Sequence, residues 1–325
     1  MNTEDYEKEL NDLFTKLFDE TNEDVSIADL YLLSDMPSTS LATFGERWAT
    51  LSDDRRRTIS RHLADISEEN FQVDFSPVSL LLFKDPLTEV RTAALDTLWD
   101  TTNINLIEPI IKLMQEDEVS AVRASAAATL GHFILMAHWD ELPRHIEQPI
   151  VEALVPNLHN DTLDPAIRRA TIESLAGSSY PEIERHIELA YEDGDPQMQR
   201  SAVFAMGRTA NKRWLPIVLN ELEHYDSEMR AEAAQAAGVI GSAEASPALV
   251  ELAYYDEDLE VRLTAVIALG AIGGDVASRA LSQLAEDPEA ADLHETIDDA
   301  LEEMMWMGGE FDLSLLDIDD EDWDD

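Results

Sequence analysis

The sequence predicts an all-α solenoid, in which successive helix pairs stack against one another. This prediction rests on a recurring arginine, a fixed period, and apolar residues at helical spacing. Each arginine follows an acidic turn and precedes a helix face of small apolar residues, and the successive gaps are 32, 45, 32, 30 and 32 residues. Such a period is typical of a repeat array, because each repeat buries its apolar face only against its neighbours. The six arginines are Arg91, Arg123, Arg168, Arg200, Arg230 and Arg262.

The first well-formed repeat shows the pattern most clearly. Its first helix is expected to begin at Ser76 and Pro77, because serine is a good N-cap and proline suits the first helical position. A turn at Lys84-Asp85-Pro86 follows. The second helix then carries apolar residues at helical spacing, namely Val90, Ala94, Leu95 and Leu98.

Glycines follow the apolar residues of most second helices. Gly131, Gly207, Gly238 and Gly270 all occupy this place in the repeat. We expect each of them to form a left-handed C-cap that turns the chain into the next helix pair.

These units resemble HEAT repeats of the short class named after phycobilisome-lyase subunits, whose core is Asp-Pro-x-x-x-Val-Arg-x-x-Ala-x-x-x-Leu-Gly. Good matches extend from Ser76 to Gly274, and weaker copies lie at 53–63 and after Asp287-Pro288. The resemblance implies a right-handed α-solenoid of about eight HEAT-type helix pairs with degenerate terminal caps. It also implies that the second helices line the concave side.

Three regions are expected along the chain. Residues 1–45, which contain an amphipathic helix, are expected to form a helical N-terminal cap. Residues 46–307 are expected to form the repeat array, and residues 308–325 an acidic, disordered tail.

The tail interleaves carboxylates with apolar residues. Phe311, Leu315 and Ile318 are spaced i, i+4 and i+7, which would place them on one face of a short helix, and Trp323 follows near the end. Three hypotheses remain open. The tail is a solubilising segment, a helix that forms on a partner, or a segment that covers the array until a partner competes for it.

Composition excludes several classes of protein. The net charge is −47, from 22 basic and 69 acidic residues, so binding to nucleic acid through its phosphates is excluded and a basic protein partner is favoured. The chain has no cysteine, which excludes disulfides and thiolate chemistry. Neither a membrane span nor a signal peptide is indicated, so we predict a cytoplasmic protein. Few lysines and many carboxylates are also typical of a salt-adapted host.

The recurring aspartates and arginines are expected to be structural. Asp85, Asp117 and Asp256 each precede a recurring arginine by six residues, which places the carboxylate in the turn and the guanidinium in the first turn of the second helix. There the arginine can bond its own turn aspartate or the matching one in the next repeat. The expected ladder consists of Asp85, Arg91, Asp117, Arg123, Arg168, Arg200, Arg230, Asp256 and Arg262.

Candidate partner contacts lie where the period breaks. The 45-residue gap holds an insertion that contains Trp139, an aromatic anchor suited to a binding face. Arg208, Lys212 and Arg213 form a basic cluster that fits an anionic segment or ordinary internal ion pairs. Arg55, Arg56, Arg57 and Arg61 form a second such cluster. The apolar residues of the tail complete this set.

No catalytic, cofactor or metal site is predicted. The histidines are scattered, and His138 and His145 in the insertion have no spacing that would bring them together. Deoxyhypusine hydroxylase has similar repeats but holds iron at several His-Glu dipeptides, whereas this chain has one, His294-Glu295.

We therefore predict a non-catalytic scaffold or adaptor that binds a basic protein. The alternatives are an assembly chaperone that shields basic proteins and an accessory subunit of a lyase or protein-modifying enzyme. The sequence leaves the partner and the oligomeric state open.

Overall fold

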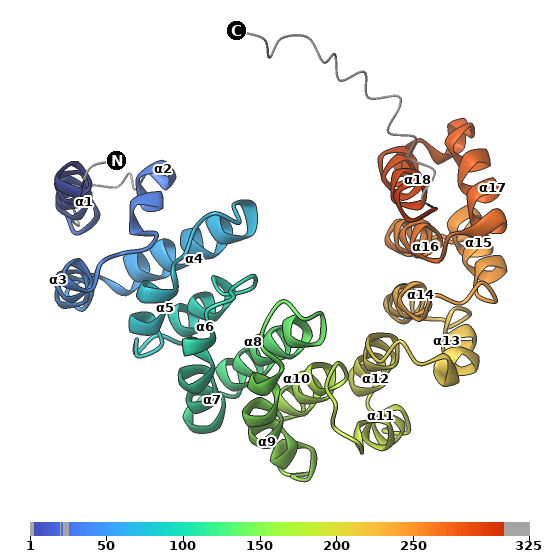
Figure 1. Ribbon diagram of the computed structural model, residues 1–325, viewed down its shortest axis with the longest axis horizontal. Helices are drawn as coiled ribbons and strands as arrows, with labels where there is room; N and C mark the ends of the chain where they lie inside the picture. The colour runs from blue at the N-terminus through green and yellow to red at the C-terminus, as the bar shows by residue number, and fades with distance from the viewer. Residues whose placement is uncertain (1–2, 20, 22–25, 309–325) are drawn as a thin grey trace, which may run out of the picture. The chain divides into compact units, whose positions relative to one another are not determined.

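The computed structural model describes residues 3–19, 21 and 26–308 (Figure 1). Eighteen α-helices and five short 3-10 helices account for the regular structure of these residues, which contain no β-strand. The predicted all-α repeat fold is confirmed.

The helices are short and evenly spaced. The first fourteen elements are α1 (Thr3–Leu17), α2 (Ile27–Leu30), η1 (Tyr31–Leu33), α3 (Ser38–Trp48), α4 (Asp53–Glu69), α5 (Ser76–Leu82), α6 (Thr88–Asp96), η2 (Ile104–Leu106), α7 (Ile107–Glu116), α8 (Ser120–His138), η3 (Arg144–Ile146), α9 (Glu147–Leu158), α10 (Pro165–Leu175) and α11 (Ile183–Tyr191). The remaining nine are α12 (Pro196–Arg208), η4 (Lys212–Trp214), α13 (Leu215–Glu221), α14 (Ser227–Ile240), α15 (Ser246–Tyr255), α16 (Leu259–Ile272), α17 (Gly274–Ala285), η5 (Pro288–Leu293) and α18 (His294–Gly308).

The chain divides into two compact units between Ser201 and Ala202. We call them the N-terminal unit and the C-terminal unit. Within each unit the helices alternate between two layers (Figure 1). In the N-terminal unit α4, α6, α8 and α10 pack side by side in one layer, and in the C-terminal unit α14, α16 and α18 do the same. We call these the B helices, and the helices that precede them the A helices.

The apolar positions predicted for the second helices form the core. Val90, Ala94, Leu95 and Leu98 are buried, as are their counterparts in later B helices. The polar opposite faces remain exposed, so each helix contributes one apolar stripe between the two layers.

The N-terminal region differs from its prediction in one element. The amphipathic helix is α1, and the helical segment expected near Ser26 is α2 with η1. Helix α3, which the sequence did not reveal, crosses the predicted boundary between residues 45 and 46 and packs on α5. Phe44 and Trp48 are its buried residues, so α3 is the A helix of the first repeat.

The glycines of the B helices do not form C-caps, so that prediction is wrong. Gly207, Gly238 and Gly270 lie inside α12, α14 and α16, one or two residues before the last residue of each helix, and Gly131 lies inside α8, seven residues before its end. The left-handed C-cap of α14 is formed instead by Gly241, which has φ of 66°.

Close helix packing explains the glycines. A Cβ on Gly238 would lie 2.9 Å from the Cα of Ala268, and one on Gly207 would lie 2.7 Å from the Cα of Ala236. Real side chains do not approach a neighbouring backbone this closely. The absent Cβ therefore lets adjacent B helices meet backbone against backbone.

We expect Gly238→Ala to destabilise the protein by about 1–3 kcal/mol, because the added methyl overpacks a contact between two helix backbones. Thermal unfolding followed by circular dichroism measures the change. Gly194→Ala is the matched control, since a Cβ there meets no atom within 4 Å. Equal melting temperatures for the two variants would contradict the close-packing account.

Candidate functional site

The turn aspartates link consecutive repeats. Arg91 on α6 donates from Nε and Nη2 to both carboxylate oxygens of Asp117, in the turn before α8, at 2.8 and 2.9 Å. Its Nη1 also donates to the backbone carbonyl of Asp85, in its own turn, at 2.8 Å. Arg230 repeats this arrangement, with bonds of 2.7 and 2.8 Å to Asp256. Each arginine therefore bonds the aspartate of the next repeat and not the carboxylate of its own.

The first rung of the ladder comes from a residue that the sequence analysis placed in a basic cluster. Arg56 on α4 donates from Nη1 to both oxygens of Asp85, at 2.9 and 2.8 Å. The indole of Trp48 donates to the same carboxylate at 2.7 Å. Arg56, Asp85 and Arg91 are all buried.

Each turn aspartate also closes an Asx turn just before its own B helix. Asp117 accepts from the N–H of Val119 at 2.9 Å, and Asp256 accepts from the N–H of Asp258 at 2.9 Å. This Asx turn fixes the carboxylate before the arginine reaches it. One side chain thus orders the turn before a B helix and joins two repeats.

Arg123 and Arg262 depart from the predicted ladder. Their Nε groups donate to carbonyls of the preceding A helices, Met114 at 2.8 Å and Ala253 at 3.1 Å. Neither forms an ion pair with another residue in the described part of the chain. For Arg123, the turn of the next repeat has Thr162 at the position six residues before Arg168, where the ladder would need an aspartate.

Arg200 is displaced from the ladder position by one residue. The close-packed glycines define the register, and eight residues before Gly207 the chain has Gln199. The side-chain amide of Gln199 donates to the carbonyl of Tyr191 at 3.1 Å, which is the kind of bond that Arg123 makes. The predicted role of Arg200 therefore belongs to Gln199.

Arg168 occupies the expected position in the repeat but does not form the expected ion pair with an aspartate of the next turn. Its neighbour Arg169 lies 3.9 Å from Asp195 in the next turn, and Arg168 makes no ion pair with any residue that the structure describes. The pair is longer and more exposed than the bonds of Arg91 and Arg230.

The two partners of the last complete rung shift each other's pKa. Burial would raise the pKa of Asp256, but bonds from Arg230 and from the N–H of Asp258 outweigh it, so the pKa lies below its usual value. The bond to Asp256 in turn raises the pKa of Arg230, although burial opposes this. Both groups are charged in the folded protein at neutral pH.

Arg91→Ala is expected to destabilise the protein by about 3–5 kcal/mol, because it leaves the Asp117 carboxylate buried without its partner. Arg123→Ala removes a single bond to a carbonyl and is expected to cost about 1 kcal/mol. Urea unfolding measures both. Lys112→Ala, which breaks an exposed pair with Glu116, is the control and is expected to change stability by less than about 1 kcal/mol. A smaller effect for Arg91 than for Arg123 would contradict the ladder assignment.

The stabilising effect of Asp256 is expected to depend on pH. Its folded-state pKa is lowered, so its contribution is fully present above the unfolded-state pKa of about 3.9 and is lost as pH falls through the folded-state pKa. The difference in unfolding free energy between wild type and Asp256→Asn is therefore expected to be largest at neutral pH and to shrink on acidification. In an Arg230→Gln background this pH dependence is expected to be much weaker. A difference that is constant from neutral to acidic pH would rule out the assigned pairing.

The insertion places Trp139 at the surface. It lengthens α8 to 19 residues, and Trp139 follows directly as the C-cap residue, 58% exposed. Arg144 donates to both oxygens of Asp140 at 2.8 and 3.0 Å, which closes the loop. Trp139 thus remains a candidate contact.

The predicted basic cluster is partly used within the C-terminal unit. The guanidinium of Arg208 lies 5.6 Å from the ring centre of Phe204, and that of Arg213 lies 4.6 Å from the ring centre of Trp214. Lys212 and Arg213 are exposed. The predicted tail contacts Phe311, Leu315, Ile318 and Trp323 lie outside the described residues.

Two consecutive turns of the C-terminal unit present exposed tyrosines among carboxylates. Tyr225 and Tyr255 are 87% and 76% exposed, and each directly precedes a turn aspartate. A surface hollow beside Tyr225 is lined by Asp226, Ser227, Glu257 and Asp258. We call these residues the tyrosine edge. The Tyr-Asp pair occurs at both places in the sequence, but neither tyrosine was predicted there as a partner contact.

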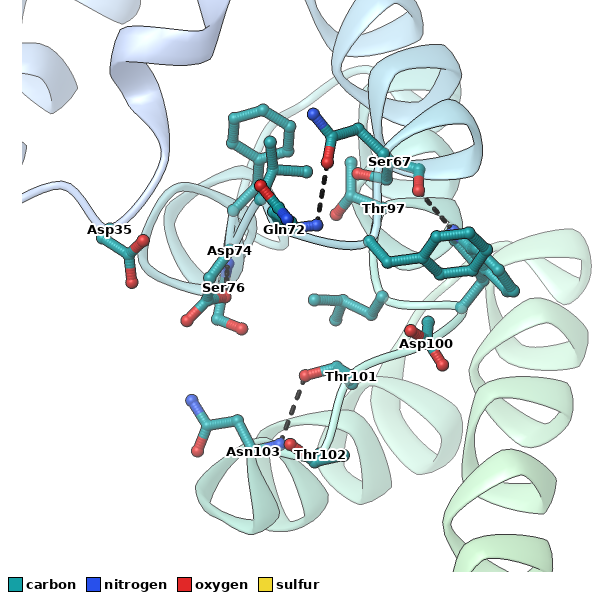
Figure 2. A pocket seen from close by; sticks show the side chains of 16 residues that line it. Asp35, Ser67, Gln72, Asp74, Ser76, Thr97, Asp100, Thr101, Thr102 and Asn103 are labelled. Atoms are coloured by element: carbon teal, nitrogen blue, oxygen red, sulfur yellow. Dashed lines mark hydrogen bonds between the residues drawn. The ribbon is translucent and has the colours of Figure 1, made fainter. Parts of the chain in front are cut away.

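A pocket in the N-terminal unit combines aromatic and acidic side chains (Figure 2). It lies between the loops that follow α4 and α6, and we call it the α4–α6 pocket. Phe71 and Trp99 pack edge to face, with ring centres 5.3 Å apart. Asp35, Asp74 and Asp100 supply carboxylates. Sequence analysis missed this site because its residues come from three separate segments.

The described residues contain neither a cluster of side chains that could hold a metal ion nor a helix that could cross a membrane. No group of three or more His, Asp or Glu side chains there is arranged to hold a metal ion. Among the same residues, no helix has the length and apolar character needed to cross a membrane.

The profile of HEAT repeats matches residues 183–262 and 219–302. Residues 183–302 contain HEAT repeats. The resemblance drawn from the arginine motif is confirmed, and the matched HEAT segment includes α14, α16 and the rung formed by Arg230 and Asp256. No curated protein matches the sequence.

Three solved structures are similar to this HEAT-repeat chain. YibA of Escherichia coli is 16% identical, with a TM-score of 0.41, over 83% of this chain and 98% of that one. The CpcE–CpcF complex of phycocyanin lyase from a Nostoc species is 18% identical, with a TM-score of 0.46, over 70% and 94%. Human deoxyhypusine hydroxylase is 16% identical, with a TM-score of 0.37, over 94% and 98%. Similarities this distant do not indicate a function.

Proposed function

We propose that the chain is a non-catalytic HEAT-repeat scaffold that binds a basic protein. The observation that carries the proposal is the tyrosine edge, where two exposed tyrosines stand among carboxylates. An aromatic face next to carboxylates attracts lysine and arginine side chains through both cation–π and charge interactions.

The ladder leaves the acidity of the surface undiminished. Arg56, Arg91 and Arg230 are buried against aspartates in neutral pairs, so the net charge of −47 rests on the remaining residues. The remaining carboxylates set a negative potential that steers basic partners and weakens with added salt.

A salt-adapted host would explain the carboxylates but not the aromatics. Acidic residues keep a protein hydrated in strong salt, whereas a tyrosine exposed at 87% exposes apolar surface without stabilising the fold. The pairing of the two residue types at successive turns therefore favours a binding edge.

The repeats favour the same class of function. HEAT arrays present regularly spaced turns, so a feature repeated in consecutive turns recurs at a fixed interval. Tyr225 and Tyr255 lie in consecutive turns, five residues before Arg230 and seven before Arg262, which suits an extended basic segment that contacts one turn after the other.

The double variant Tyr225→Ser with Tyr255→Ser is expected to weaken binding of a fluorescein-labelled, arginine- and lysine-rich peptide by about tenfold in fluorescence anisotropy. A glutamate-rich peptide of equal length is expected not to bind. The matched control is Val239→Ser with Ile267→Ser, which removes exposed apolar side chains from B helices. If this control lost binding while the tyrosine variant kept it, the partner would bind the B helices and not the tyrosine edge.

The predicted contacts elsewhere stay predictions within this proposal. Trp139→Ser tests the insertion in the same peptide experiment, and removal of residues 309–325 tests the tail. An assembly chaperone would in addition suppress aggregation of a basic protein, which a scaffold need not do.

A further inference from the structure

The α4–α6 pocket is small and is lined by three segments of the N-terminal unit. Its volume is about 290 Å³, and its lining comes from the loop after α4, the loop after α6 and Asp35 (Figure 2). This volume lies at the lower limit of small-molecule sites, which span about 300–1,000 Å³. It is sufficient for one side chain of a protein partner.

The aromatic wall is held in place by its own contacts. The indole N–H of Trp99 donates to the carbonyl of Ser67 at 2.8 Å, so the ring cannot rotate freely. Phe71 packs edge to face on Trp99 yet is 71% exposed. An apolar ring left this exposed, beside a fixed indole, is available to a ligand at no cost in rearrangement.

The acidic wall is fixed as well. The N–H of Asp74 donates to the Ser34 hydroxyl at 2.9 Å, and its backbone carbonyl accepts from the N–H of Asp35 at 2.8 Å. One carboxylate oxygen of Asp74 accepts from the N–H of Ser76 at 2.8 Å. The other carboxylate oxygen of Asp74 remains available to a donor.

Ser76 supplies a polar group that the fold does not use. The sequence predicted it as the N-cap of α5, but it is the first residue of the helix, and Asp74 accepts its N–H. Its side chain is 1% exposed, and its hydroxyl has no hydrogen-bond partner in the described structure. A buried hydroxyl without a partner is unfavourable, and Ser76 lines this pocket. Because the hydroxyl itself is buried, it would bond a ligand in the pocket after the Ser76 side chain rotates toward it.

Charge selects the class of ligand. None of the residues that line the pocket is lysine, arginine or histidine, whereas Asp35, Asp74 and Asp100 are acidic. On the adjoining turn of α6, desolvation and the Glu68 carboxylate raise the pKa of Asp96, with Arg61 offsetting part of the effect. Carboxylates are thus crowded around the pocket, which favours a cation.

We propose that the α4–α6 pocket binds the guanidinium group of an arginine side chain on the basic partner. The proposal rests on the proposed function, since it names the group that one part of the partner presents. Arginine fits better than lysine because its flat guanidinium stacks on an aromatic ring while its edge donates to carboxylates and a hydroxyl. The chain uses the same stacking internally, where Arg47 lies 4.6 Å from the ring centre of Phe18.

The test uses the full chain and three capped tripeptides in which arginine, lysine or uncharged citrulline lies between two glycines. The indole N–H resonance of Trp99, assigned with Trp99→Phe, reports binding in two-dimensional NMR. We expect the arginine peptide to shift it saturably, the lysine peptide to bind about tenfold more weakly, and the citrulline peptide to leave it unchanged. Equal shifts from the arginine and lysine peptides, or none from arginine, would overturn the proposal.

Two variants separate the pocket from general electrostatics. Asp74→Asn with Asp100→Asn keeps the side-chain oxygen that caps Ser76 and is expected to abolish the shift caused by the arginine peptide. Asp161→Asn with Asp298→Asn makes the same change in net charge at exposed positions outside the pocket and is expected to preserve the shift. Equal loss in both variants would show attraction by net charge alone and contradict a specific site.

The outcome is separable from that of the proposed function. If the labelled basic peptide still binds the Asp74→Asn, Asp100→Asn variant at full strength but not the Tyr225→Ser, Tyr255→Ser variant, the scaffold stands and the pocket proposal fails. Phe71→Ser, an exposed substitution, gives a second check that does not alter charge. This variant is expected to weaken the binding of the arginine peptide only.

Discussion

The buried bond between an arginine and the turn aspartate of the next repeat is the contact on which the architecture depends. Asp117 and Asp256 each close the turn before their own B helix and accept hydrogen bonds from the arginine of the preceding repeat. A single carboxylate therefore orders a turn and also fixes how two neighbouring repeats meet. Buried ion pairs often add little net stability compared with apolar packing, but a misplaced partner is costly, so they specify register well. The positions of the turns, and of the side chains that the turns present, follow from this bond.

The repeat was predictable because it is local. The arginine, the acidic turn and the apolar helix face lie within a few residues of one another in the sequence. In the structure, the apolar positions predicted for these helices are buried. The atoms in contact were harder to infer. Arg200 satisfied the spacing, yet the packing of Gly207 shows that Gln199 occupies the position. Glycine at a helix end usually indicates a C-cap, and only the contact with the neighbouring helix reveals its role here.

The candidate sites illustrate a different limit. Tyr225 and Tyr255 lie in consecutive turns but at different positions of the repeat, five residues before Arg230 and seven before Arg262, so periodicity alone would not have paired them. Phe71, Asp74 and Trp99 share no motif, and they meet only because consecutive loops lie next to each other in a repeat array. Ser76 carried a misleading signal, since serine before a proline usually caps a helix. Whether a hydroxyl has a partner depends on its three-dimensional neighbours.

The glycine contacts have a mechanical consequence for the C-terminal unit. Gly207, Gly238 and Gly270 bring each B helix against the next with no side chain between them, so this spacing cannot shrink and can increase only by breaking contact. The A helices of this unit are in looser contact with one another than the B helices are. Bending of this unit is therefore expected to hinge along the line of glycines, with the A helices spreading or closing. Because the exposed tyrosines lie in the turns between the two layers, such bending would change the distance between them and adapt the edge to segments of different length.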